Sequence, residues 1–204
     1  MDITLPTHVC NLALSRICSK RFVYSGDTET DLDANTTLEA KICNLNYEQT
    51  RDSLLRSHWW RFARKSVVLA LDTETPPFEW DYQYILPEDF LRVISVYEGN
   101  MSNINLYSYA IEGDKLLTNE TTVSLRYIRK VTDVKEFDPL FTEVLVLRLA
   151  WKLIPPLAGT KTAVFTEALK EEIKVVTRQV LAVDKQETNT VGVYELETWN
   201  NSRF

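Results

Sequence analysis

The stretch TTLEAKICNLNYEQTRDSLLRSHWWRFARK, residues 36–65, decides how the rest of the chain must fold. It contains no Pro or Gly, and its apolar residues recur three, four or seven positions apart, which is the spacing of one helix face. Thr36, with Glu39 three residues later, forms a capping box, so we predict one helix that begins there and spans the stretch. The helix ends in two adjacent tryptophans, Trp59 and Trp60, flanked by arginines.

After this helix the hydrophobic pattern changes to the alternation that is typical of strands. Residues 66–72 are a short apolar run, and three further alternating runs follow before position 135. Gly113 and Asp114 separate two runs and indicate a hairpin turn. Few basic residues stand among the aromatic ones, so we assign the aromatic side chains to sheet core rather than to base stacking. The sequence therefore predicts a compact antiparallel β-domain.

Helical sequence stands on both sides of this β-domain. Residues 7–20 read as a first helix with Thr7 as its N-cap. Residues 162–186 read as a last helix whose apolar stripe is close to a heptad and suits packing along a neighbouring helix. The stripe consists of Phe165, Leu169, Ile173, Val176, Val180 and Val183.

The segment 140–154 is apolar almost all round, which predicts the buried central helix of a bundle. Asp138 and Pro139 provide a cap and a first-turn proline. We expect the tandem prolines at 155–156, together with Gly159, to end this helix.

These elements predict an α+β fold in which no helix buries its stripe alone. A four-helix bundle-like helical domain is formed by residues 1–65 and 136–187. An antiparallel β-domain, residues 66–135, is inserted between the second and third long helices, and residues 188–204 form a C-terminal tail.

Composition narrows the possible functions. The net charge of −6 argues against a general affinity for nucleic-acid phosphates. Cys10, Cys18 and Cys43 lack the spacing of a zinc site, so we interpret them as small buried side chains in a reducing compartment. We find no signal peptide and no apolar run long enough to span a membrane.

No metal, cofactor or catalytic motif stands out. The segment that includes residues 31–35 resembles a calcium-binding loop but lacks the required glycine and bidentate glutamate. No nucleophile elbow, phosphate loop or dinucleotide fingerprint occurs. We therefore expect no enzymatic activity. The alternative is a hydrolase that cleaves a sugar polymer such as peptidoglycan, in which carboxylates such as Glu88 or Glu112 would be catalytic.

The basic and aromatic end of the long helix is a candidate interface. Its arginines either interact favourably with the helix C-terminus and with water, or contact acidic segments such as 27–33 of another subunit. The tail keeps large apolar residues that could dock on a partner. The candidate interface residues are Arg56, Trp59, Trp60, Arg61, Arg64, Tyr194 and Trp199.

Five segments, in this order, resemble the tail tubular protein A family of short-tailed bacteriophages, which are head-to-tail adaptors. They are VCNLALSRI, LLRSHWWRFARK, LPEDFLRV, IEGDKLLTN and YIRKVTDVKEFDPLFTEVLVLRLAWKL. Together they cover most of residues 8–155 and keep the family's spacing. The chain departs from the pattern at Cys18, where a glycine is common, and after Glu187.

The resemblance implies a structural virion protein, made in the host cytoplasm, that forms a ring, typically of twelve copies, beneath the portal. The helical domains would pack side by side and meet the portal protein. The β-domain would lie outward and help to hold the tail nozzle, tubular protein B, and the tail fibres. DNA would pass through the lumen during ejection without sequence-specific binding, and no membrane would be involved.

Overall fold

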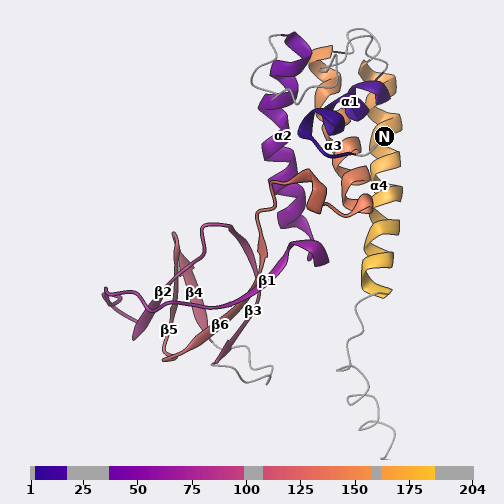
Figure 1. Cartoon of the computed structure of the whole chain (residues 1–204). Helices are drawn as coiled ribbons and strands as arrows, with labels where there is room; N and C mark the ends of the chain where they lie inside the picture. The colour runs from indigo at the N-terminus through magenta and orange to yellow at the C-terminus, as the bar shows by residue number, and fades with distance from the viewer. Residues whose placement is uncertain (1–2, 18–36, 99–107, 158–161, 187–204) are drawn as a thin grey trace, which may run out of the picture.

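A computed structural model describes residues 3–17, 37–98, 108–157 and 162–186 (Figure 1). The helices are α1 (Pro6–Arg16), α2 (Leu38–Ser57), α3 (Pro139–Leu157) and α4 (Thr162–Gln186), with short 3-10 turns η2 (Arg61–Ala63) and η3 (Val134–Glu136). The strands are β1 (Arg64–Val68), β2 (Tyr82–Ile85), β3 (Phe90–Glu98), β4 (Tyr109–Glu112), β5 (Lys115–Thr118) and β6 (Val123–Arg129). The fold is therefore α+β, with every described strand between α2 and α3, as predicted.

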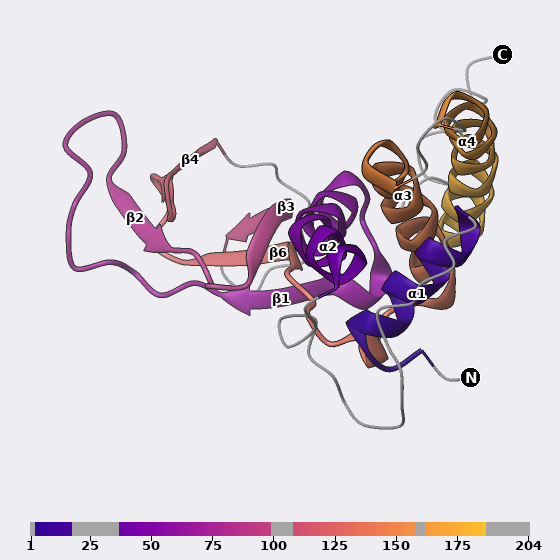
Figure 2. The same ribbon diagram turned by 90° about the horizontal axis from the view of Figure 1, so that it is seen from above.

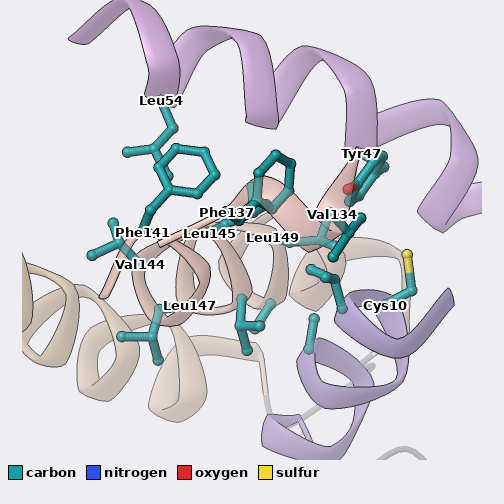
Figure 3. Packing of buried hydrophobic residues seen from close by; sticks show 14 of the residues in the cluster. Cys10, Tyr47, Leu54, Val134, Phe137, Phe141, Val144, Leu145, Leu147 and Leu149 are labelled. Carbon is teal, nitrogen blue, oxygen red and sulfur yellow. The ribbon is translucent and has the colours of Figure 1, made fainter. Parts of the chain in front are cut away.

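The helices gather around α3, which contacts α1, α2 and α4. Its side chains are buried on nearly all sides, so the predicted central helix is confirmed. Phe141, Leu145 and Leu149 point from it into the main hydrophobic cluster, which also takes in Tyr47 and Leu54 of α2 (Figure 3).

The strands form two antiparallel sheets of three strands, in the orders β1-β6-β3 and β2-β5-β4. A second hydrophobic cluster contains Tyr84 and Leu116 from one sheet and Leu125 and Tyr127 from the other. Because side chains alternate along a strand, Ile128 of β6 joins the helical cluster while Tyr127 joins the β cluster. Strand β6 thus links the two cores.

The predicted hairpin at Gly113-Asp114 is confirmed. The two residues connect β4 to β5, and Gly113 has a φ of 60°, a conformation that glycine adopts without a steric penalty. The bounds of α4 also agree with the prediction.

The long helix ends earlier than predicted. It stops at Ser57 rather than at Lys65, because the chain is extended at His58 and β1 already begins at Arg64. Its N-cap is Thr37, whose hydroxyl accepts a hydrogen bond from the Ala40 N–H at 3.3 Å, whereas Thr36 lies outside the described residues.

Two other helix ends also differ from prediction. Helix α1 begins at Pro6, whose fixed φ suits the first helical position, so Thr7 lies inside the helix and is buried. Helix α3 continues through the tandem prolines to Leu157. Both prolines are exposed whereas Leu153 and Ile154 before them are fully buried, so packing holds the last turn helical.

Candidate functional site

Trp60 occupies the point where the chain leaves the helical domain. Its side chain is only 3% exposed, and its ring meets the Phe141 ring edge to face at a centroid distance of 5.0 Å. Its indole Nε1 donates a hydrogen bond to the Leu54 carbonyl at 2.9 Å, which satisfies one of the free carbonyls at the end of α2. Trp60 is therefore part of the core of this chain.

Trp59, in contrast, is 46% exposed and is held between two arginines. The Arg64 guanidinium donates from Nε and Nη2 to the Trp59 carbonyl at 3.1 and 2.9 Å. The Arg92 guanidinium lies over the indole ring, 5.8 Å from its centroid. Trp59 thus joins the helix end to β1 and β3.

Arginines also bridge α2 and β3 in both directions. Arg56 Nη1 donates to the Leu91 carbonyl at 2.9 Å, and Arg92 Nη1 donates back to the Arg56 carbonyl at 3.2 Å. Close by, Asp52 of α2 pairs with Lys130, just beyond β6, at 3.2 Å. The arrangement fixes the β-domain against the end of α2.

Most of the arginines that were predicted to form an interface therefore make contacts within the chain. Arg56 and Arg64 donate hydrogen bonds to backbone carbonyls, as described above. Arg61 is exposed and lines a cavity of about 280 Å³ with Asp138 and Val183, near the end of α4. Among the predicted interface residues that the structure describes, Arg56, Trp59 and Arg61 are exposed.

A polar network that the sequence did not reveal lies close to the contacts between α2 and the β-domain. Asp89 accepts hydrogen bonds from Lys65 Nζ at 2.9 Å and from the Tyr127 hydroxyl at 2.6 Å. Burial alone would raise the pKa of Asp89, but these two donors outweigh it and lower that pKa below its ordinary value. Burial and the Asp89 hydrogen bond raise the pKa of Tyr127 to about 12. The sequence pair Glu88-Asp89 gave no hint of this, because the partners are distant in the chain.

A basic groove of about 330 Å³ opens between α2, α3 and α4. Its lining includes Arg148 and Lys152 of α3, Lys170 and Lys174 of α4, and the half-exposed Trp151. These cations are spread over two helices and were not singled out in the sequence.

The other predicted residues take ordinary places or fall outside the described part of the chain. Glu88 and Glu112 are exposed. Cys10 and Cys43 are buried, as predicted, and the contact with Cys43 together with burial raises the Cys10 pKa. Tyr194, Trp199, Cys18 and the acidic segments at 27–33 and 31–35 lie outside the described residues.

Among the described residues, no three His, Cys, Asp or Glu side chains are grouped so that they could hold a metal ion. None of the described helices is long and apolar enough to cross a membrane.

No protein-family model matches the chain, and no curated protein matches it.

Proposed function

We propose that this chain is a structural virion protein, a ring-forming adaptor that joins the portal to the tail nozzle and surrounds the channel for DNA ejection. One observation carries the proposal. The five segments that resemble tail tubular protein A stand in family order, and a β-domain is inserted between the second and third long helices of the same chain.

The junction geometry supports this role. An adaptor must hold one domain at a fixed angle to the other, because small errors in angle prevent a ring from closing. The reciprocal bonds between Arg56 and β3, and the Asp52–Lys130 pair, supply such a rigid connection. The negative charge also suits a lumen through which phosphates slide without binding.

The experiment is electron microscopy of the purified full chain mixed with the portal protein encoded in the same genome. We expect closed symmetric rings seated on the portal. A chain that stays monomeric in the presence of the portal would overturn the proposal. The same images give the copy number, for which the resemblance implies twelve.

The alternative function, a virion-associated peptidoglycan hydrolase acting at infection, makes a different prediction. Glu88 and Glu112 are both exposed, whereas glycoside hydrolysis needs two carboxyl groups that flank one scissile bond. A zymogram on peptidoglycan with the purified chain should show no clearing. Clearing that disappears in Glu88→Gln or Glu112→Gln would establish the hydrolase instead.

A further inference from the structure

The basic groove between α2, α3 and α4 contains a cation without a counter-charge. Arg148 is half-buried and has no hydrogen bond or ion pair within the described part of the chain, and burial lowers its pKa. Removing a guanidinium from water without an anion nearby is unfavourable, so the groove is electrostatically incomplete.

The neighbouring lysines are only weakly neutralised. Lys170 lies 3.8 Å from Glu167, and Lys174 lies 3.0 Å from Glu171, each one turn away on the exposed face of α4. Surface pairs of this kind contribute little and exchange easily for better partners. The groove also has an apolar side, because Trp151 is 44% exposed there. A fitting ligand carries several carboxylates beside an apolar or aromatic group.

The described chain contains such a segment in the β1–β2 connection, DTETPPFEWD at residues 72–81. Glu74, Glu79 and Asp81 are exposed, and Phe78 is 70% exposed. The Trp80 N–H donates to the Phe78 carbonyl at 2.8 Å, a three-residue turn centred on Glu79, which has a φ of 67°. We name residues 72–81 the acidic loop.

The acidic loop does not reach the groove of its own chain. Figures 1 and 2 show the β1–β2 connection at the end of the β-domain that faces away from α3 and α4. If the acidic loop enters such a groove, the groove must therefore belong to another molecule.

We propose that the acidic loop of one copy docks in the basic groove of the next copy. Carboxylates of the loop meet Arg148 and the two lysines of α4, while Phe78 packs on Trp151. Because the two surfaces are different, the contact is head-to-tail, and such contacts close into rings when the rotation permits. The inference rests on the proposed ring, for which it supplies the contact between subunits.

Nucleic acid is the other polyanion that fits four cations. The exposed aromatic side chain in the groove and the net charge of −6 favour a protein segment over DNA. DNA binding is therefore treated as an outcome of the test.

Disulfide trapping in the full chain tests the contact. In a Cys18→Ser background, one variant carries Thr75→Cys in the acidic loop and a second carries Ser53→Cys in the groove wall, both at exposed positions. We expect the mixture of the two, with portal present, to form a disulfide-linked pair. The matched control replaces Ser53→Cys by Ser15→Cys on the exposed face of α1, and it should give only background linkage.

Charge reversal gives the second arm. Lys170→Glu/Lys174→Glu in the groove variant, or Glu74→Lys/Glu79→Lys in the loop variant, should each lower the linkage about tenfold, and the two reversals combined should restore it. Melting curves of the reversed variants show whether they are folded.

The outcomes separate this inference from the proposed function. Rings on the portal without loop-to-groove linkage overturn the inference and leave the adaptor standing. Linkage that survives each reversal made alone also overturns it. Linkage without rings overturns the adaptor only, and the absence of both overturns both. Binding of labelled duplex DNA that is lost on groove reversal, without linkage, replaces the inference with a phosphate site.

Discussion

At the residue scale, Trp60 has two roles at one position. Its ring fills the space beside Phe141, and its indole nitrogen binds the Leu54 carbonyl at the end of α2. Trp59, its neighbour in sequence, contacts Arg92 and remains half-exposed. The helical spacing of apolar residues in the long stretch includes Trp59 and not Trp60, so it indicated the wrong ring as the buried one. Which ring is buried depends on the cavity that α3 offers.

Trp60→Ala should therefore lower the free energy of unfolding by about 3–5 kcal/mol, the usual cost of removing a large buried ring. Trp60→Phe loses the hydrogen bond to Leu54 and the second ring of the indole but keeps the rest of the packing, so its cost should lie between those of the original chain and of Trp60→Ala. Trp59→Ala should cost less than about 1 kcal/mol. Urea denaturation measures all three variants, and equal losses for the two alanine variants would contradict this assignment.

The Asp89 network predicts a pH dependence. The folded-state pKa of Asp89 lies below its ordinary value, so folding favours the carboxylate. Its contribution is fully present above the ordinary aspartate pKa of about 4 and is lost as the pH falls through the lower folded value. Tyr127→Phe removes one donor and should cost about 1–2 kcal/mol at neutral pH.

The cost of Tyr127→Phe should shrink as the pH falls through the lowered folded-state pKa of Asp89, because the carboxyl group is then protonated in both proteins. Asp89→Asn provides the control, since it should flatten the acid side of the stability curve. Urea midpoints across the acid range measure the effect. A cost for Tyr127→Phe that stays constant with pH would rule out the charged hydrogen bond.

At the element scale, helices whose apolar period is uninterrupted were predictable in full. The bounds of α4 follow from its apolar stripe. The end of α2 at Ser57 does not follow from periodicity, because the pattern cannot show that the Trp60 indole binds a carbonyl of the last turn. The exposed tandem prolines of α3 wrongly predicted the end of that helix. Their preference for ending a helix is overridden by the burial of the residues just before them.

The start of α3 offers a prediction at this scale. Asp138 Oδ1 accepts hydrogen bonds from the backbone N–H groups of Leu140 at 2.8 Å and Phe141 at 3.4 Å. Asp138→Ala leaves these donors without a side-chain partner and should cost about 1 kcal/mol, while Asp138→Ser should retain most of the stability. Chemical denaturation measures both variants, and an Asp138→Ala variant as stable as the original chain would show that the cap contributes nothing.

At the scale of the whole molecule, the sequence predicted the inserted β-domain because the hydrophobic period changes twice, once on each side of it. It did not predict how the domains are joined. The bridges pair α2 with β3 and with the end of β6, residues that lie far apart in the chain. The basic groove was missed likewise, because its cations come from two helices that only the fold places side by side.

From the hydrogen bonds between α2 and β3 we predict that the angle between the two domains depends on Arg92. Arg92→Leu removes both the bond to the Arg56 carbonyl and the contact with Trp59, but it leaves both hydrophobic clusters intact. We expect a cost of less than about 1 kcal/mol in unfolding, since the side chain lies outside both cores. The radius of gyration from small-angle X-ray scattering should rise, and fewer rings on the portal should close.

Arg126→Leu is the matched control, because Arg126 stacks on Tyr97 at 5.5 Å within the β-domain and makes no bridge to α2 that the structure describes. It should leave the scattering and the rings unchanged. If Arg92→Leu closes rings as often as Arg126→Leu, the arginine bridge does not set the angle. The Asp52–Lys130 pair and the packing of Ile128 in the helical cluster would then be sufficient to hold the domains together.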